Sequence, residues 1–507
     1  MKALDLIIIF GYLIGIVLFG TWFGRKQKTT SDYFLGDRSV PWWAVAFSIV
    51  ATETSTITFI SVPGIAFSRG GNFQFLQLVL GYLLGRVVIS LLFIPSYFRG
   101  QLLTVYQLLD RRFGGKIKVL AASLFVVMRN IADGIRLLLT AIVLAAVYTA
   151  FQPAANAEMI IITSIVLIGV AMIVFTYFGG MEAVIWVEVI QLGIYIAGAI
   201  AAAVVLIGAI DGGFATATLS GSQYGKFSLF DFSFSATKTF TFWSGLIGGC
   251  FLTMSTHGTD QYLVQRYLCT DRPRKAIVAL LTSGAIVLGQ FIGFLFIGVL
   301  LFAFYHPFSD PAYLTAPAAF PFAAGDRVFP DFITKYMPSG LAGLVVAAIF
   351  AAAMSSSLNS IAATAVNDLY KPIRPQRSDD HYLKVSHLLT LVWGVVQIGV
   401  ALAVRKQSGS ALSNALSVAS LINGPILGVF LVGTFLRRVS QPPALIGMLT
   451  SCAVMMYVFL QTTIAWTWYV FLGSAVTFVV AWLTSLVFAP APASAQDELA
   501  PAIVTKD

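Results

Sequence analysis

Long, uninterrupted apolar runs dominate the sequence. About thirteen of these runs reach the roughly 20 apolar residues that a helix needs to cross the hydrocarbon core of a bilayer. They are continuously apolar, whereas the strands of a membrane barrel alternate between apolar and polar positions. The pattern therefore predicts an all-α polytopic membrane protein. The expected spans cover residues 4–22, 41–66, 73–97, 117–150, 158–178, 183–209, 239–258, 275–304, 338–367, 384–404, 409–436, 443–461 and 466–488.

Composition excludes the soluble classes. Of the 507 residues, 58% are hydrophobic and 10% are charged, whereas an average soluble domain carries roughly 25% charged residues. A soluble enzyme, a disordered protein and a nucleic-acid-binding protein are excluded, because so little polar surface cannot solvate a globule of this size. The three cysteines, Cys250, Cys269 and Cys452, are expected to be free thiols. The four histidines lack metal-ligand spacing, so no metal centre is expected from them.

Basic residues predict the orientation of the chain. The first span has no small-residue cleavage site and a basic cluster follows it, so we expect a true span and not a signal peptide. Lys and Arg then gather after the first, third, seventh, ninth and eleventh spans, which places those loops in the cytoplasm and the amino terminus outside. One loop, with Arg405 and Lys406, disagrees weakly. Residues 1–488 form the expected membrane domain of a plasma-membrane protein, and residues 489–507 a disordered cytoplasmic tail.

Six ionisable residues lie well inside predicted spans, where charges are costly and therefore candidates for function. Arg129 and Asp133 are four residues apart on one helix face, so we expect them to form a structural pair. Arg136 then keeps spare donors, and a guanidinium offers a rigid fork for a carboxylate. Arg86 is expected to be structural. The other two candidates are Glu53 and Glu188.

Glu53 and Glu188 have no obvious cation nearby in the sequence. A buried carboxylate without a partner becomes neutral or binds a cation. This observation favours coupling to Na⁺ or H⁺. The alternative is that each is a protonated, hydrogen-bonded carboxyl group.

Two predicted spans carry matching interruptions. The first has a hydroxyl-rich run over residues 51–58 followed by Pro63 and Gly64. The second has Gly245, Gly248 and Gly249 followed by a polar run over residues 253–259. Paired interrupted helices in corresponding halves are the best sequence indication of a transporter's midplane site, so residues 41–209 and 239–436 are expected to be two inverted repeats. The alternative is ordinary packing of small residues.

The serine-rich segment of residues 351–360 is a third candidate. Clustered hydroxyls in an apolar helix suit a hard cation that binds oxygen ligands. Serines that only pack helices together are the alternative.

The polar motifs of these spans resemble those of the sodium/solute symporter family, which includes bacterial proline, sugar and sialic acid carriers. The resemblance extends from about residue 4 to about residue 488. It implies a leucine-transporter-like fold of two five-helix inverted repeats with flanking helices, alternating access, and Na⁺ as the coupling ion. The stretches that carry it are DYFLG at 32–36, WW at 42–43, ATETS at 51–55, WVEVIQ at 186–191, HGTDQ at 257–261, QR at 265–266 and NDLY at 367–370.

The resemblance also implies roles for individual residues. Relatives have an aspartate supporting a second Na⁺ at the position of Glu188, and Arg136 corresponds to a carboxylate clamp. The implied Na⁺ ligands are Ala51, Thr54, Ala352, Ser355, Ser356, Ser357 and Glu188. The implied solute-binding residues are Glu53, Ser55, Thr58, Gln77 and Arg136. The implied gating or structural residues are Pro63, Gly248, Gly249, His257, Asp260 and Gln261.

The serine segment departs from the family pattern. Met354 runs directly into the serines at 355–357, as though about three residues were missing. Such a loss turns a helix by roughly 60° and shortens it by about 4.5 Å. Either the helix is locally rewound, or one Na⁺ site is altered or lost, and the mapping of Ser355–Ser357 onto the family's ligands shifts by up to one turn.

The functional interpretation is Na⁺-driven symport of a small organic solute, and no enzyme activity is expected. Arg136 and Gln77 favour a carboxylate such as a sialic acid or another sugar acid. The expected partners are the solute, Na⁺ and the bilayer, with a single subunit as the working unit and no nucleic acid. The alternatives are symport of a neutral sugar or amino acid, H⁺-coupled symport, and a non-transporting membrane sensor.

Overall fold

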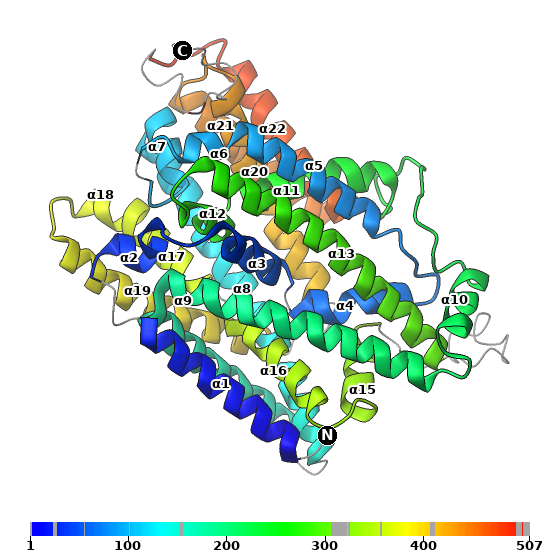
Figure 1. Ribbon diagram of the computed structural model, residues 1–507. Coiled ribbons are helices and arrows are strands. Elements are labelled where there is room, and N and C mark those ends of the chain that lie inside the picture. Colours follow the sequence, from blue (N-terminus) through cyan, green and yellow to red (C-terminus); the bar gives the residue numbers. More distant parts are fainter. Residues whose placement is uncertain are drawn as a thin grey trace.

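The structure, a computed structural model, describes residues 3–23, 28–54, 56–100, 102–152, 156–305, 322, 325–354, 357–405, 411–492 and 499. Within these ranges the chain forms helices and no strands (Figure 1). The first half contains α1 Ala3–Phe23, α2 Thr30–Leu35, η2 Gly36–Arg38, α3 Trp42–Glu53, α4 Thr56–Phe67, α5 Leu76–Leu92, α6 Ile94–Tyr97, α7 Tyr106–Phe113, α8 Gly115–Phe151, α9 Ala157–Ala209 and α10 Gly213–Gln223. The second half contains η3 Ser244–Gly248, α11 Gly249–Gly258, α12 Gln261–Leu268, α13 Pro273–Tyr305, η5 Gly325–Arg327, α15 Val328–Lys335, α16 Leu341–Met354, α17 Leu358–Thr364, η6 Ala365–Tyr370, α18 Lys371–Ile373, α19 Asp379–Val404, α20 Ala411–Phe435, α21 Gln441–Gln461, η7 Trp466–Trp468 and α22 Tyr469–Thr484.

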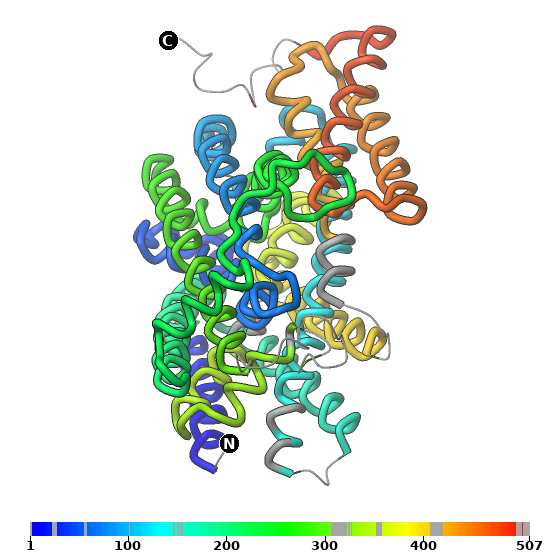
Figure 2. Tube along the Cα trace, turned by 90° about the vertical axis from the view of Figure 1, so that its right-hand side faces the viewer, coloured from blue at the N-terminus to red at the C-terminus, as the bar shows by residue number. Residues whose placement is uncertain are grey.

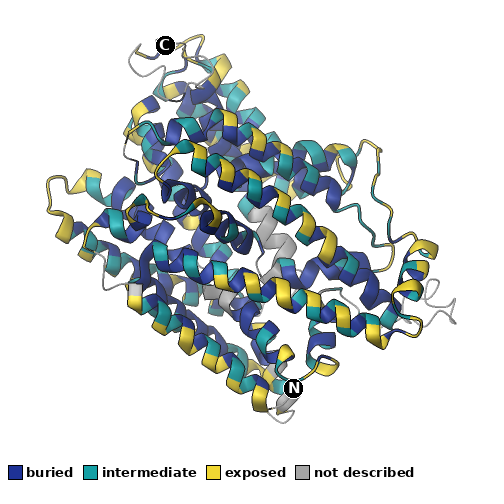
Figure 3. Ribbon diagram, viewed as in Figure 1, coloured by how far each residue is buried: buried dark blue, intermediate teal, exposed yellow. Residues whose placement is uncertain are grey.

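The outer helices present apolar side chains to the surroundings. In α1, Ile7 is 68% exposed and Leu18 is 63% exposed, and exposed positions follow the outer edges of α1 and α9 in Figure 3. Contiguous exposed apolar surface of this kind needs a lipid environment. Six described helices, and a seventh if the bent pair α3–α4 is one span, are long and apolar enough to cross a membrane. The multi-pass prediction is confirmed, and the count of thirteen stays a prediction.

Helix α9 contains two of the expected spans. It is 53 residues long, and a kink at Gly180 divides it into two arms. Gly180 has φ 57° there, a left-handed conformation that glycine adopts without the strain a Cβ atom brings. The predicted boundary between residues 178 and 183 thus coincides with the kink.

The first interrupted helix is confirmed. Helix α3 ends at Glu53, Thr54 has non-helical backbone angles (φ −82°, ψ 63°), and α4 begins at Thr56. The axes on the two sides of this break differ by 57°. Hydroxyl-rich residues therefore lie where the backbone leaves the helix.

The second interruption lies further along the chain than the glycines suggested. Residues 244–248 form a π-helical turn that continues into α11, and the break comes at Thr259 and Asp260, before α12. The chain does not unwind at the glycines, because these residues serve close packing, and the break falls at Thr259, the end of the predicted polar run. A Cβ atom on Gly249 would lie 2.5 Å from the carbonyl oxygen of Leu78 in α5, and small residues let helix backbones approach this closely.

The serine segment is also interrupted. Helix α16 ends at Met354, and Ser357 occupies the N-cap position of α17. Within the described residues of the expected span 338–367, a turn at Ser357 precedes α17. Ser355 and Ser356 lie outside the described residues.

The packing places the interrupted helices at the centre of the molecule. Helices α20, α21 and α22 pack on one another near the carboxyl end, and α1 packs on α9 and α16 at the opposite end (Figures 1 and 2). Helix α3 packs on α9 and α13, while α11 packs on α5 and α20.

Smaller expectations also have outcomes in the structure. Cys250, Cys269 and Cys452 are free thiols, as predicted.

The start of the expected tail is bound to the turn before α21. The Ser440 hydroxyl donates to the carbonyl oxygen of Ala489 at 2.8 Å, and the Ala491 amide donates to the carbonyl oxygen of Arg438 at 2.9 Å. Residues 493–498 and 500–507 lie outside the described residues.

Candidate functional site

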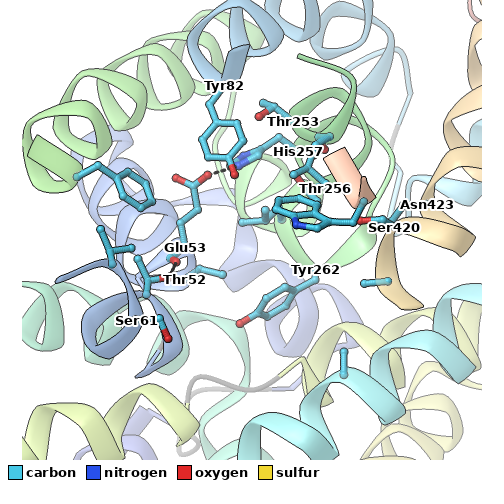
Figure 4. Close-up of a pocket in the computed structure, with 18 of the residues that line it drawn as sticks. Thr52, Glu53, Ser61, Tyr82, Thr253, Thr256, His257, Tyr262, Ser420 and Asn423 are labelled. Carbon is cyan, nitrogen blue, oxygen red and sulfur yellow. Dashed lines mark hydrogen bonds and ion pairs between the residues drawn. The ribbon is translucent and has the colours of Figure 1, made fainter. Parts of the chain in front are cut away.

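A cavity of about 410 Å³ lies between the two interrupted helices (Figure 4). Helices α3, α4, α8, α11 and α20 supply its polar wall, and α5, α12, α13, η7 and the segment before η3 add aromatic rings. The polar lining residues are Thr52, Glu53, Thr58, Ser61, Arg129, Arg136, Thr253, Thr256, His257, Ser420 and Asn423. The aromatic lining residues are Phe75, Tyr82, Phe240, Tyr262, Phe291 and Trp466.

Glu53 joins the two interrupted helices across this cavity. Its Oε1 lies 2.6 Å from Nε2 of His257 in α11, and its Oε2 lies 2.5 Å from Nη2 of Arg86 in α5. The other ring nitrogen of His257 is 2.7 Å from the Tyr267 hydroxyl. The expectation that Glu53 lacks a cation is wrong, because its partners come from sequence positions 33 and 204 residues away. Arg86 is fully buried as the counter-ion of Glu53, and its structural role stays a prediction.

Arg129 pairs with a different acid from the one expected. Its guanidinium forms an ion pair with Asp260, the N-cap residue of α12, whose other carboxylate oxygen accepts the Tyr262 amide at 2.9 Å. The predicted Arg129–Asp133 pair is therefore wrong. Asp133 instead accepts hydrogen bonds from the amide and hydroxyl of Ser357. The tertiary structure, which brings Asp260 to α8, decides that Arg129 pairs with Asp260. The spacing of residues within α8 cannot reveal this pairing.

Arg136 lines the cavity, as a solute clamp must. Its Nη1 lies 3.3 Å from the Tyr262 hydroxyl and 3.6 Å from Oδ1 of Asp133. The Tyr262 ring also faces the guanidinium groups of Arg129 and Arg266, at 4.5 and 4.7 Å from its centroid. A tyrosine ring is a favourable surface for cations, so Tyr262 gathers three arginines, of which Arg129 and Arg136 line the cavity.

Glu188 has a buried cation of its own. Arg266 of α12 approaches both carboxylate oxygens, with Nε 3.2 Å from Oε2 and Nη2 against Oε1. Thr52 donates to Oε1 at 3.1 Å, and Ser48 donates to Oε2. The expectation of a carboxylate without a partner is wrong here as well. Glu188 does not line the cavity, so it connects α9, α12 and α3 behind it.

The proposed Na⁺ ligands are only partly within the described residues. Ala51 and Thr54 are buried in α3 and at its end. The Thr54 hydroxyl lies 2.7 Å from the Val50 carbonyl oxygen and 2.9 Å from Oε1 of Gln290, and it can donate to one of them at a time. Ala352 lies in α16, and Ser357 binds Asp133. The structure brings Ser357 to α8 and does not describe Ser355, Ser356 or the Ala352 side chain, so the Na⁺ ligand set stays a prediction.

The proposed solute-binding residues divide into two groups. Glu53, Thr58 and Arg136 line the cavity, and the Thr58 hydroxyl donates to the Glu53 carbonyl oxygen across the break at 2.9 Å. Gln77 does not line it. Its side-chain oxygen accepts the Asp231 amide at 2.9 Å, and its nitrogen donates to the Gln74 carbonyl oxygen at 3.1 Å. Ser55 lies outside the described residues.

The proposed gating residues occupy helix contacts and breaks. Pro63 lies inside α4, and Gly298 of α13 packs on it so closely that a Cβ atom would meet its carbonyl oxygen at 2.2 Å. Gly248 packs in the same way on the Thr467 carbonyl oxygen. Gln261 accepts the Val105 amide at 2.8 Å and donates to the Leu103 carbonyl oxygen at 3.1 Å. Their roles in gating stay predictions.

Sequence reasoning missed several cavity residues. Tyr82, Tyr262, Ser420 and Asn423 line the wall and had not been singled out. Tyr262 follows directly after the HGTDQ motif, and Asn423 precedes Gly424 and Pro425 inside an apolar helix. A polar residue beside a helix-breaking pair was an available signal for Asn423.

The lining defines what the cavity can bind. Guanidinium groups, hydroxyls, the Asn423 amide and aromatic rings line the space. This chemistry suits a small solute with a carboxylate and several hydroxyl groups, held by hydrogen bonds and ring contacts.

Comparisons with known proteins agree with this geometry. The model of the "Sodium:solute symporter family" matches residues 33–451. The sodium/sialic acid symporter NanT of Aliivibrio fischeri is 32% identical over 96% of this chain and 94% of its own. A solved substrate-bound, outward-open Na⁺-coupled sialic acid symporter overlaps with a TM-score of 0.84 at 30% identity, covering 97% of this chain and 99% of that one. Mhp1, a nucleobase-cation-symport-1 family transporter, shares the fold at a TM-score of 0.58 and 14% identity, covering 92% and 97% of the two chains.

Proposed function

The chain belongs to the sodium:solute symporter family, and on that premise we propose that it carries a sialic acid or a related sugar acid together with Na⁺. One observation carries the choice of solute: Arg136 lies in the wall of the central cavity, beside Tyr262. A guanidinium there can bind a carboxylate through two parallel hydrogen bonds. The cavity volume of about 410 Å³ falls within the roughly 300–1,000 Å³ typical of small-molecule sites.

Family membership confirms the coarser expectations. The chain is a multi-pass membrane transporter and not an enzyme, it couples transport to Na⁺, and it has the helical fold of leucine-transporter-like symporters. The neutral-solute, H⁺-coupled and sensor alternatives have no such support.

For the Na⁺ site, we propose the end of α3 and the end of α16. Ala51 and Thr54 would contribute oxygens at the first break, and Ala352, Ser355 and Ser356 would complete the ligand set. Unwound backbone frees carbonyl oxygens for a cation. Glu188, already held by Arg266, Ser48 and Thr52, supports α3 in this proposal and does not bind the ion directly.

The number of Na⁺ ions carried per solute decides which parts of the ion gradient can drive transport. A membrane potential contributes about 2.3 kcal/mol per charge per 100 mV, and a tenfold Na⁺ gradient contributes about 1.4 kcal/mol. A monoanion moving with one Na⁺ carries no net charge and uses only the chemical gradient. Electrogenic uptake of the anion would therefore mean at least two Na⁺ per solute.

We further propose an amino terminus outside, a cytoplasmic carboxyl terminus and a single working subunit in the plasma membrane. One contact supports the arrangement of the loops. Arg405 lies 3.8 Å from Glu158, so the carboxyl end of α19 is at the same end of the molecule as the start of α9. The proposed topology places both of these helix ends outside.

The experiment is thermal unfolding combined with calorimetric binding of N-acetylneuraminate, in NaCl and in equimolar KCl. We expect Na⁺ to stabilise the protein and N-acetylneuraminate to add to the shift, because a ligand of the folded state raises its stability. Arg136→Ala should weaken N-acetylneuraminate binding by about 10- to 100-fold, the value of a hydrogen-bonded charge, while sparing the Na⁺ shift. Arg272→Ala, which alters an exposed pair with Asp271, is the matched control.

Two results would overturn the proposal. Unchanged N-acetylneuraminate affinity in Arg136→Ala would remove the clamp. Stabilisation by neutral sugars, with none by sugar acids, would keep the symporter and replace the solute class.

A further inference from the structure

Asp133 connects the cavity to the start of α17. The side chain is buried, and its Oδ2 accepts the backbone amide of Ser357 at 3.0 Å and also the Ser357 hydroxyl. Its Oδ1 is buried without a hydrogen bond and lies 3.6 Å from Nη1 of Arg136. One carboxylate therefore holds the N-cap of α17 with one oxygen and faces the proposed solute clamp with the other.

The ion pairs around the cavity differ in how closely the guanidinium approaches the carboxylate. Glu53, Asp260 and Glu188 each have a hydrogen-bonded arginine, namely Arg86, Arg129 and Arg266. The pair between Arg136 and Asp133 is wider than a hydrogen bond. Among the described residues, the contact between Arg136 and Asp133 is the longest of these four. A solute carboxylate that binds Arg136 therefore competes with this longest contact.

We propose that Asp133 couples solute binding to Na⁺ binding, an inference that rests on the proposed function. The four carboxylate–arginine pairs are balanced in charge, so a carboxylate solute that binds Arg136 adds one uncompensated negative charge to the buried region. An unbalanced charge in a low-dielectric interior is costly, and a Na⁺ ion bound near the start of α17 restores neutrality. The anion and the ion therefore favour each other's binding through Asp133.

A second helix-capping aspartate shows what capping alone looks like. Oδ1 of Asp5 accepts the amides of Gly340 and Gly343 at 2.7 and 3.0 Å, and its Oδ2 accepts the Ser339 hydroxyl at 3.2 Å. Asp5 lies in α1, and both of its carboxylate oxygens thus bind the start of α16. Asp133 commits only one oxygen to its helix, so the two residues form a matched pair for an experiment.

The experiment measures N-acetylneuraminate affinity in NaCl and in equimolar choline chloride for the parent, Asp133→Asn and Asp5→Asn. The parent should bind more tightly in Na⁺ by a factor within the typical coupling range of about 5- to 150-fold. In Asp133→Asn this ratio should fall towards one, with affinity in choline near the parent's affinity in Na⁺, because Arg136 and the solute then balance each other. Asp5→Asn should lose stability and keep the parent's ratio.

A parent-like ratio in Asp133→Asn would overturn the inference and leave Asp133 as a helix cap. If that variant does not fold, the methyl ester of N-acetylneuraminate tests the parent directly. Binding of the neutral ester should be indifferent to Na⁺, and a Na⁺ dependence equal to that of the acid would overturn the inference. A parent that binds the acid in neither salt would instead refute the proposed function.

Discussion

Two buried glutamate–arginine pairs with similar chemistry occupy very different surroundings. Glu188 and Arg266 have side chains that are each 1% exposed, and neither lines the cavity. Glu53 is 17% exposed and lines the cavity, although its partner Arg86 is 1% exposed. The first pair joins α9 to α12, and the second joins α3 to α5 at the wall of the cavity.

The difference shows that exposure to the cavity, more than residue type, distinguishes a charge that only supports the fold from a charge that can interact with a ligand. A fully buried ion pair cannot exchange its partners, and removing one partner leaves the other charge buried without compensation. A pair on the cavity wall can exchange partners with water, a solute or an ion. Removing Arg266 should therefore affect folding, and changing Glu53 should affect binding.

The largest effect is expected for Arg266→Ala. Removing one partner of a buried pair costs about 3–5 kcal/mol, because the remaining charge is uncompensated. Thermal unfolding of the purified protein should show this loss. Asp380→Asn, in the exposed pair with Lys384, should cost at most about 1 kcal/mol. Equal losses in the two variants would contradict the distinction between buried and exposed pairs.

A smaller loss of stability is expected for Glu53→Gln, about 2 kcal/mol, since the amide oxygen can still accept from Arg86. The variant should also bind N-acetylneuraminate more tightly. Removing one negative charge from the wall relieves about 1 kcal/mol of repulsion, or roughly fivefold in affinity. Calorimetric titration at saturating Na⁺ measures this change. Weaker binding would indicate instead that Glu53 contacts the solute or the ion directly.

The smallest effect is expected for His257→Gln. This change weakens the contacts to Glu53 and Tyr267 but leaves the Glu53–Arg86 pair in place. We expect a loss of about 1 kcal/mol, typical of one neutral hydrogen bond. Thermal unfolding and N-acetylneuraminate titration measure it. If His257→Gln destabilised the protein as much as Arg266→Ala, the cavity-side pair would have to be regarded as structural too.

Much of the fold could be predicted because the bilayer imposes it locally. Apolar runs of span length, the break after Glu53 and the boundary near Gly180 all follow from residues that are neighbours in the chain. Arg136 was also recognised correctly as a cavity candidate, because a charge inside a predicted span is costly wherever it lies. The second break was displaced because glycines favour both unwinding and close helix contact, and only the position of α5 distinguishes the two.

The sequence by itself determined that this is a helical, multi-pass, Na⁺-coupled carrier with interrupted helices. Only the tertiary structure decided which charges are partners. Spacing along a helix reveals contacts three or four residues apart, whereas Glu53 meets His257 204 residues away, Arg129 meets Asp260 131 residues away and Glu188 meets Arg266 78 residues away. These pairings depend on how separate helices pack, and the cost of burying an unpaired charge then selects them.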